Sequence, residues 1–478
     1  MSVSEHSCHF RLDSTRFMRS LEVMTFQGTE AINKPFSFEI QAVSFHGELD
    51  VQQCLFSDAY LSSKLPGIGF HGEIQSIGRS NTGQGPAHYS ITLGPHMGRL
   101  AQRYNQRIFQ DMLAKSIIRQ VLREHGIHED SVVFDLSKRY EQLDFCAQHN
   151  ETDLQLLDRL CAQEGFHYYF EHSNAQHVLV FSDDLRHSPR STSVHFESQF
   201  ARGEISQFEL GVPIKRGLKT PTVLRIKGAS ALDFLRSGQQ LPMTGHPDVQ
   251  CNQGWLLTEV HHRGSRPAFQ SGVVTPAYLN SFSGVQAAFG MERAKPESPP
   301  RRIGLQRARI AGALFDEAQR DHEGRIKVRF DWGYQGDGSR YDDCWLPLEP
   351  NLENADRPWW GGMEVIVSFV DGDPDQPEII DYVCDPDISP RDPDAVSNSV
   401  LPIPITPPHS VTTRLDRQSF LGDAQQIRID DLTLHLDSSN ELNFSVGNSH
   451  VKISSEGVTL VSPNIVMAAR MPVDEPDL

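Results

Sequence analysis

The sequence predicts a mainly β protein with a helical insertion and a repetitive C-terminal segment. Short runs in which apolar and polar residues alternate dominate residues 10–95 and 178–290. The period lengthens to that of a helix near residues 112–125 and 153–164. Residues 410–471 break into a ladder of short alternating runs separated by Asp, Ser, Asn or Gly. Alternation places one apolar face on each strand, so strands dominate the predicted fold.

Strands are predicted on both sides of the helical insertion. Residues 36–40, 72–78 and 89–93 alternate before it, and residues 178–181 and 222–226 alternate after it. This pattern predicts either one α+β body or two β domains around a helical insertion.

The two predicted helices carry their own end signals. The first has four apolar residues on one face: Ile117, Ile118, Val121 and Leu122. Gly126 can end that helix in a left-handed conformation. In the second helix, Thr152 and Gln155 form a capping-box pattern at the start, and Gly165 can end it. The strand 166–170 follows immediately.

Composition limits the classes of function. The chain has 478 residues, enough for about three domains, and 38% of them are hydrophobic. The net charge is −18 and no Lys/Arg-rich run stands out, which argues against nucleic acid and anionic membranes as partners. No run approaches the roughly 18 apolar residues of a membrane span, so stable membrane insertion is not expected.

Cysteine usage and the N-terminus point to the cytosol. The seven cysteines are scattered, odd in number and free of any Cys-x-x-Cys pair, which argues against a disulfide framework or a structural zinc site. The N-terminus has no apolar signal-peptide core. We therefore expect synthesis without a signal peptide, and export by a route that needs none stays open.

Shifts in composition divide the chain into six parts. They are a body (1–291), a linker (292–303), a small barrel (304–384), a Pro-rich linker (385–409), a shaft (410–471) and an acidic tail (472–478). Five short strands within about eighty residues predict that the barrel is of the OB type. In the shaft, the one-sided strands can bury their apolar faces by winding into a β-helix, alone or with identical chains. A protein with such a shaft is more mechanical than catalytic in character.

The patterns that could indicate chemistry have structural interpretations. Residues 67–72 match G-x-G-x-x-G, but a strand follows instead of a helix N-terminus, so we expect a turn. His125 and His128 stand at a helix end, where we expect exposed side chains. His261 and His262 are neighbours on a strand and point to opposite faces, so they cannot easily share a metal.

The acidic residues also give no ligand or catalytic pattern. Asp371, Asp373 and Asp375 alternate as in a calcium loop, but Gln376 and Tyr382 occupy the positions that need Gly and Glu. An Asp/Pro-rich β-turn is the expected structure. The sequence has no G-x-S-x-G elbow and no P-loop. We therefore predict no enzyme activity and no catalytic, cofactor-binding or metal-binding residues.

Four motifs follow one another along the chain. The residues that define them are Pro35, Phe36 and Phe38; Asn150, Asp153, Glu164, Gly165, Tyr168 and Tyr169; Gly324, Lys327 and Val328; and Gly372, Asp373, Pro374 and Pro377. In this order the motifs resemble the VgrG family, the spike proteins of the bacterial type VI secretion system. That family is similar to the hub and spike proteins of contractile phage tails. The motif positions are therefore predicted to be structural.

The resemblance implies a fold and an assembly. It implies a homotrimer with a tail-hub-like β-barrel body, an OB-fold neck, and a C-terminal triple-stranded β-helix, or β-prism, as the needle. The implied partners are an Hcp tube, baseplate components, and a PAAR-domain tip protein or an effector that carries a PAAR domain. The implied route is assembly in the cytoplasm and secretion to the extracellular space or into target cells.

Two features depart from the family pattern. Residues 359–363 read Trp-Trp-Gly-Gly-Met where the family often has Pro-Arg before its closing strand. The shaft is also short by the family's standard, and no extra domain follows it, so a spike with a fused toxin is not expected.

The tip-binding residues are predicted from the last apolar run. The run would end the needle with an open strand edge, and it consists of Ile465, Val466, Met467, Ala468 and Ala469. Two other functions stay open. One is a hub-spike protein of a phage tail or an extracellular contractile injection system. The other is a polysaccharide or cell-wall depolymerase, which a β-helix shaft would also suit.

Overall fold

The computed structural model divides the chain into two compact units, residues 1–390 and 391–478. Each unit is described by itself. The structure describes residues 10–17, 19–45, 48–63, 67–80, 86–196, 205–211, 223–233, 235–266, 269–270, 273–274, 277–291, 304–330, 343–353 and 358–383 of the first unit. In the second unit it describes the backbone of five strands.

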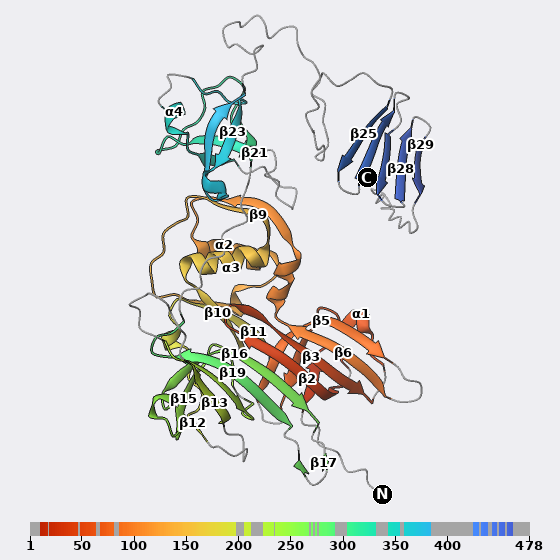
Figure 1. The fold of residues 1–478 in the computed structure, drawn as a ribbon, viewed down its shortest axis with the longest axis vertical. Coiled ribbons are helices and arrows are strands. Elements are labelled where there is room, and N and C mark those ends of the chain that lie inside the picture. The colour runs from red at the N-terminus through yellow and green to blue at the C-terminus, as the bar shows by residue number, and fades with distance from the viewer. Residues whose placement is uncertain are drawn as a thin grey trace, which may run out of the picture. The chain divides into compact units, whose positions relative to one another are not determined.

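A closed six-stranded barrel begins the fold (Figure 1). Its strands are β1 (Arg11–Ser14), β2 (Leu21–Ala31), β3 (Lys34–Ser44), β4 (Asp58–Ser62), β5 (Gly69–Ser80) and β6 (Ala87–Gly94). They pair in the order β1-β4-β5-β6-β3-β2, and a further pairing of β1 with β2 closes the barrel. Along β3, Phe36, Phe38 and Ile40 are buried and Glu39 is exposed, because alternate side chains point to opposite faces.

A second set of strands continues the same sheet. They are β13 (Ile205–Gly211), β14 (Arg225–Ser230), β16 (Gly254–Ser265) and β19 (Tyr278–Gln286), with β12 (Val194–His195) and β15 (Gln240–Thr244) at the side. Strand β16 pairs antiparallel with β2, so one sheet runs through both sets. Two glycines let aromatic rings lie on this seam, since a Cβ on Gly28 or Gly264 would fall 2.0 Å from the Phe38 or Phe26 ring.

The helical insertion packs on the first barrel. It contains α2 (Ala114–Glu124) and α3 (Asp153–Glu164), where the sequence predicted helices. The strands around them are β7 (Tyr104–Phe109), β8 (Val132–Asp135), β9 (Cys146–Thr152), β10 (His167–His172) and β11 (His177–Ser182). One apolar core runs from the barrel through both helices and into the sheet β10-β11-β8. Figure 1 shows this insertion next to the small barrel of residues 306–382.

Shorter elements complete the first unit. They are α1 (Val51–Cys54), η1 (His96–Gln102), η2 (Glu129–Ser131), η3 (Leu185–His187), η4 (Val249–Cys251), and the two-residue strands β17 (Phe269–Gln270) and β18 (Val273–Val274). None of the helices within the described residues combines the length and the hydropathy that a membrane crossing requires.

The small barrel has OB topology, as predicted. It consists of β20 (Gln306–Ile310), β21 (Ile326–Phe330), β22 (Cys344–Leu346), β23 (Glu364–Phe369) and β24 (Pro377–Tyr382), with α4 (Pro350–Glu353) and η5 (Val370–Gly372) between strands. The pairing order is β22-β21-β20-β23-β24. A parallel bridge between Leu348 and Ile379 joins the two ends of this order and closes the barrel. The interior is filled by apolar side chains such as Val328, Val365 and Val367.

The second unit is an antiparallel meander within one chain. Its strands are β25 (Ala424–Ile429), β26 (Leu432–Asp437), β27 (Leu442–Val446), β28 (Ser449–Ser454) and β29 (Gly457–Val461). Each strand pairs with the next one along the chain. Five short strands of the predicted ladder are therefore confirmed, and the last apolar run, residues 465–469, lies outside the described residues. The intertwined three-chain needle stays a prediction.

Two smaller expectations can be compared directly with the structure. The predicted turn at residues 67–72 is only partly correct: Gly67, with a left-handed φ of 78°, precedes β5, but residues 69–72 already belong to that strand. The predicted strand 222–226 begins later, at Arg225, and its first residue lies outside the described residues.

Candidate functional site at the joint between the helical insertion and the small barrel

Helix α3 begins with a complete capping box. The Thr152 side chain accepts from the Gln155 backbone N–H, and the Gln155 side chain accepts from the Thr152 backbone N–H. Asn150, two residues earlier, has a φ of 52°, a left-handed conformation that Asn tolerates better than most residues. Gly165 ends the helix with a φ of 78°. These local signals fix where the helix starts and therefore where Asp153 points.

Asp153 is fully buried and accepts hydrogen bonds from four side chains. Its oxygens lie 2.6 Å from Arg103 Nε, 3.0 Å from Arg107 Nη2, 2.7 Å from His125 Nε2 and 2.8 Å from Gln148 Nε2. Burial by itself would raise the pKa of Asp153. The hydrogen bonds from His125 and Gln148 and the two guanidinium groups outweigh it and hold that pKa at about 2.

His125 contradicts the prediction of an exposed helix end. Only 9% of its side chain is exposed, and its Nε2 lies 2.7 Å from Asp153. The residue is the C-cap of α2, with Gly126 behind it in a left-handed conformation at φ 75°. The glycine turns the chain so that the imidazole faces the start of α3. The position of His125 at a helix end did not reveal this orientation in the sequence.

Arg159 connects α3 to the small barrel. Its Nη2 lies 2.7 Å from Glu151 Oε1 and 3.0 Å from the Ala147 carbonyl, and its Nη1 lies 2.5 Å from Asp375 Oδ2. The other Asp375 oxygen accepts from the Ala147 backbone N–H at 2.7 Å. Only 3% of the Arg159 side chain and 16% of the Asp375 side chain are exposed. One guanidinium thus bonds the helix, β9 and the η5–β24 turn together.

This site contains one cation, Arg159, and two carboxyl groups, those of Glu151 and Asp375. Burial raises the pKa of Glu151 and of Asp375. The charge of Asp375 adds to the rise at Glu151, and the charge of Asp373 adds to the rise at Asp375, so the lowering effect of the shared Arg159 is outweighed. The two carboxylates raise the pKa of Arg159 above its ordinary value. The arginine is therefore always charged, and its loss would leave two acids buried without a cation.

Further contacts widen the joint. Gln110 exchanges two hydrogen bonds of 2.8 Å with the backbone of Trp345 on β22. Ile108 and Phe145 from the insertion pack against the apolar core of the small barrel. Arg325 lies 3.7 Å from Asp111. The joint therefore combines apolar packing with paired hydrogen bonds and a buried ion pair.

The motif residues lie in structurally demanding positions. Phe36, Phe38, Tyr168 and Tyr169 are buried, and the Tyr168 hydroxyl donates to Asp158 at 3.0 Å. Gly324 and Gly372 have left-handed φ values of 80° and 75°.

The remaining motif residues lie on strands, at an element end or in a turn. Val328 is buried on β21, and Lys327 Nζ lies 5.6 Å from the centre of the Trp345 ring. The Asp373 carboxylate accepts from the Asp375 backbone N–H at 3.0 Å. Pro35 lies on β3, Glu164 ends α3, Pro374 follows Asp373 in the turn, and Pro377 starts β24.

Several residues of the joint were not singled out from the sequence. Arg159 and Arg107 carried no motif signal, and Asp375 was assigned only to a turn. The sequence did contain one clue, because Arg159 stands among the apolar positions of a predicted helix. An arginine buried there needs an acidic or polar partner. The predicted tip-binding residues 465–469 lie outside the described residues, so their role stays a prediction.

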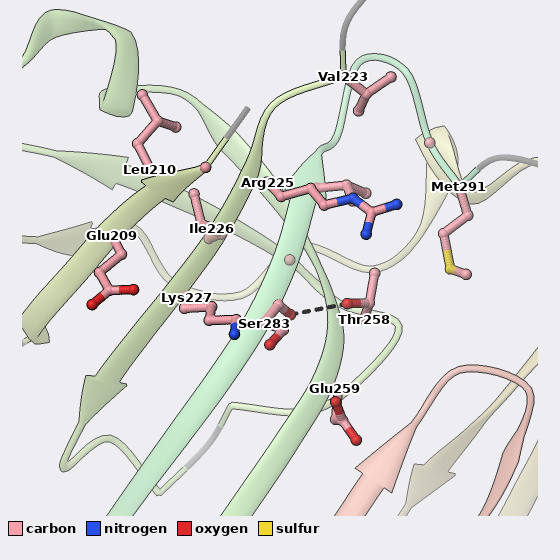
Figure 2. A pocket seen from close by; sticks show the side chains of 14 residues that line it. Glu209, Leu210, Val223, Arg225, Ile226, Lys227, Thr258, Glu259, Ser283 and Met291 are labelled. Carbon is pink, nitrogen blue, oxygen red and sulfur yellow. Dashed lines mark hydrogen bonds between the residues drawn. The ribbon is translucent and has the colours of Figure 1, made fainter. Parts of the chain in front are cut away.

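A concavity lies on the large sheet and is lined by residues of β13, β14, β16 and β19. It measures about 690 Å³, and Figure 2 shows Glu209, Lys227 and Glu259 spread along its lining. The Thr258 hydroxyl donates to the Ser283 carbonyl at 3.2 Å. No histidine or cysteine is among its described lining residues. Within the described part of the chain, no group of three or more His, Cys, Asp or Glu side chains could hold a metal ion.

Known proteins match most of the chain. Residues 29–210 match the phage tail baseplate hub (GPD) family. Two type VI secretion system spike proteins of Pseudomonas aeruginosa, VgrG4b and VgrG5, are 30% and 29% identical to this chain. The matches cover 77% and 79% of this chain. The chain spans only 55% and 57% of those two proteins.

A solved structure shares the fold. It is the E. coli c3393 protein, described as a type VI secretion component similar to the T4 tail proteins gp27 and gp5. It superposes with a TM-score of 0.65 at 22% identity, covering 78% of this chain and 99% of that one. Together with the spike-protein relatives, these matches confirm the resemblance drawn from the four motifs. The chain belongs to the VgrG family of type VI secretion system spike proteins.

Proposed function

We propose that this chain is the structural spike of a type VI contractile apparatus, acting as a trimer that punctures membranes and carries other proteins. The observation that supports it best is the joint between the insertion and the small barrel. A spike must pass axial force from its hub to its needle, and a joint with a buried Arg159–Asp375 pair and apolar packing resists shear. The proposal also rests on relatives that are named as spike proteins.

The needle and its partners form the second part of the proposal. Three copies of residues 410–471 would intertwine, because each one-sided strand needs an apolar surface to cover it. Intertwining would also remove the free edges that β25 and β29 present in a single chain. An Hcp tube and baseplate components would contact the hub. A PAAR-domain tip protein, or an effector with a PAAR domain, would bind at residues 465–469.

The route of export follows from this function. We propose assembly in the cytoplasm without a signal peptide, followed by secretion through the type VI apparatus to the extracellular space or into a target cell. We also propose that the chain itself is not an enzyme. The relatives named as spike proteins support this view.

Deletion of the gene tests the function directly. We expect loss of Hcp from the culture medium and loss of target-cell killing, both restored by the wild-type gene. Unchanged Hcp release would contradict the spike function. A hub-spike role in a phage tail or an extracellular injection system would leave type VI secretion intact, and the neighbouring genes would encode that other machine. Release of sugars from peptidoglycan or capsule by the purified chain would indicate a depolymerase.

Two measurements on the purified chain test the assembly. Light scattering should give a mass near 161 kDa, three times the 53.7 kDa of one chain. A stable monomer would contradict the intertwined needle. Removing residues 464–478 should preserve the trimer and abolish co-purification of the tip protein. Loss of both together would mean that the segment serves assembly and not tip binding.

A further inference from the structure

A row of hydrogen-bonded histidines crosses the body between the first barrel and the β10–β11 hairpin. His96 on η1 donates its backbone N–H to His177 Nε2 at 3.2 Å. His177 Nδ1 lies 3.1 Å from His71 Nδ1. The His71 backbone N–H in turn donates to His172 Nδ1 at 3.2 Å. The row thus joins η1 and β5, on the barrel side, to β11 and β10 in the hairpin.

Both ends of the row meet a carboxylate. His96 Nε2 lies 2.7 Å from Asp58, whose side chain is 55% exposed. At the other end, His172 Nε2 lies 3.2 Å from the buried Glu30. His262 Nε2 lies 2.9 Å from the other Glu30 oxygen. The row therefore runs from the surface of the barrel to its buried interior.

The bonding fixes where the protons are. His177 Nε2 accepts from a backbone N–H, so the neutral ring carries its proton on Nδ1 and donates it to His71 Nδ1. A second proton on His177 would have to bind Nε2, where it would repel the backbone N–H of His96. A proton on His71 Nδ1 would set two N–H groups against each other at 3.1 Å. Neither ring can become charged while these contacts persist, and both residues are only 5% exposed.

The neighbouring groups do not compensate such a charge at the centre of the row. Asp58 attracts a charge on His71, but burial outweighs this attraction, and His96 and His172 repel the charge. The carboxylates lie at the ends of the row, at Asp58 and Glu30, while Arg99 acts on Asp58 and the buried Arg236 acts on His262. Tyr278 on β19 approaches His262 at 2.5 Å. Apolar rings surround the centre, with Phe36 and Phe170 centred 5.7 and 6.1 Å from the His177 ring.

We propose that the His71–His177 contact is an acid-sensitive latch that holds the β10–β11 hairpin against the first barrel. The geometry requires both rings to be neutral, so acid releases the hairpin by protonating them. Burial and the neighbouring histidines lower the pKa of His177 to about 2, and burial lowers the pKa of His71. This inference does not depend on the proposed function, because it concerns the stability of the body alone.

The sign of the effect follows from linkage. A histidine whose pKa is lowered in the closed form stabilises that form fully above its ordinary pKa of about 6.5. The contribution falls as the pH drops below that value, by about tenfold in the closed-to-open ratio per pH unit and per histidine. Two such histidines therefore make the latch sensitive from about pH 6.5 downwards, and for His177 this sensitivity continues to about pH 2.

Hydrogen exchange of the full-length protein tests the latch. After correction for intrinsic exchange, the protection of the His96 and His71 amides, which donate to His177 and His172 across the row, should fall at least tenfold between pH 7.5 and 5.0. His177→Gln can keep one donor and one acceptor without titrating and leaves only His71 to titrate, so its protection should fall at least threefold less than that of the wild type. If that variant is already open at pH 7.5, His71→Gln leaves only His177 to titrate and should show the same reduced fall.

Two controls separate the latch from general burial. His167 is buried on β10 outside the row, and burial lowers its pKa to about 4. His167→Gln should therefore keep the acid-dependent loss of His96 protection. Exposed His88, replaced by Gln, should behave as wild type. Wild-type protection that stays constant from pH 7.5 to 5.0 would overturn the proposal, as would an acid sensitivity of the His177 and His71 variants that equals that of the wild type.

Discussion

Arg159 and Asp375 lie 216 positions apart in the sequence, yet Arg159 Nη1 contacts Asp375 Oδ2 at 2.5 Å in a nearly buried site. The arginine lies on α3, directly after the Asn-Glu-Thr-Asp motif, and the aspartate lies in the Gly-Asp-Pro-Asp turn of the OB barrel. Two motifs that identify the family from the sequence are thus two sides of one joint. The turn therefore has a specific role, which is to present Asp375 to the helix.

Replacing Arg159 by Met should destabilise the body strongly. The change leaves Glu151 and Asp375 buried without a cation, and breaking a buried ion pair typically costs about 3–5 kcal/mol. Because burial raises the pKa of both acids, they can take up protons in the variant, so the loss should be smaller at pH 5 than at pH 8. Urea unfolding at the two pH values measures this.

The pair Arg186–Asp184, in which 58% of the arginine and 18% of the aspartate side chain are exposed, provides the more accessible control for that experiment. Arg186→Met should lower the urea midpoint much less than Arg159→Met. The idea that Arg159 holds the joint fails if Arg159→Met and Arg186→Met behave alike. A double cycle with Asp375→Asn should also show strong coupling between positions 159 and 375, since the two side chains contact each other directly.

Asp153 should make the body sensitive to strong acid. Its pKa falls from an ordinary 3.8 to about 2 in the folded chain, so its contribution is complete above pH 4 and disappears as the pH falls through 2. A shift of this size corresponds to roughly 2 kcal/mol at neutral pH. Asp153→Asn should lose that contribution at pH 7, and the difference from wild type should shrink between pH 4 and 2.

Chemical unfolding at pH 7, 4 and 2 checks this expectation, with exposed Asp130→Asn as the comparison. A gap between wild type and Asp153→Asn that is constant over the whole range would mean that ionisation of Asp153 contributes nothing.

The capping box of α3 should contribute measurably by itself. Thr152→Ala removes the side-chain oxygen that accepts from Gln155 N–H, and loss of such a cap costs about 1 kcal/mol. Thermal unfolding should show a lowered midpoint. Exposed Thr192→Ala changes the same side chain away from any helix start and should have no effect. Equal midpoints for the two variants would show that tertiary packing alone fixes the start of α3.

Gly28 should not tolerate a side chain. An alanine Cβ there would lie 2.0 Å from the Phe38 ring, so the ring must leave its place, and overpacking of this kind costs about 1–3 kcal/mol. Gly78→Ala on β5 meets only a carbonyl oxygen at 3.9 Å and should be tolerated. Unfolding midpoints compare the two. Adding Phe38→Leu to Gly28→Ala should recover part of the loss, and a further decrease would exclude the steric explanation.

Much of the local structure could be predicted because it depends on neighbours in the sequence. The alternating strands, the helices α2 and α3, the capping box at Thr152 and the left-handed Gly165 all follow from spacing and from the conformational range of single residues. The five strands of the OB barrel were also predicted, and the parallel Leu348–Ile379 bridge closes them as that fold requires.

The site was harder to predict because the sequence does not show which charged side chains pair with each other in the folded chain. His125 was expected at an exposed helix end, but it turns inward because Asp153 offers a buried acceptor. Arg159 could equally have faced solvent. Arg159 is buried because Glu151 of β9 and Asp375 of the η5–β24 turn both contact it, and these contacts form only in the folded chain.

The sequence by itself therefore determined the β-rich architecture, the helix ends and the family, because periodicity, caps and short motifs are local properties. The tertiary structure decided which distant groups share one buried site, namely Arg159 with Asp375 and His71 with His177. The physical reason is desolvation. A buried polar group is stable only where its partners are supplied from all sides, and that condition is set by the packing of the whole body.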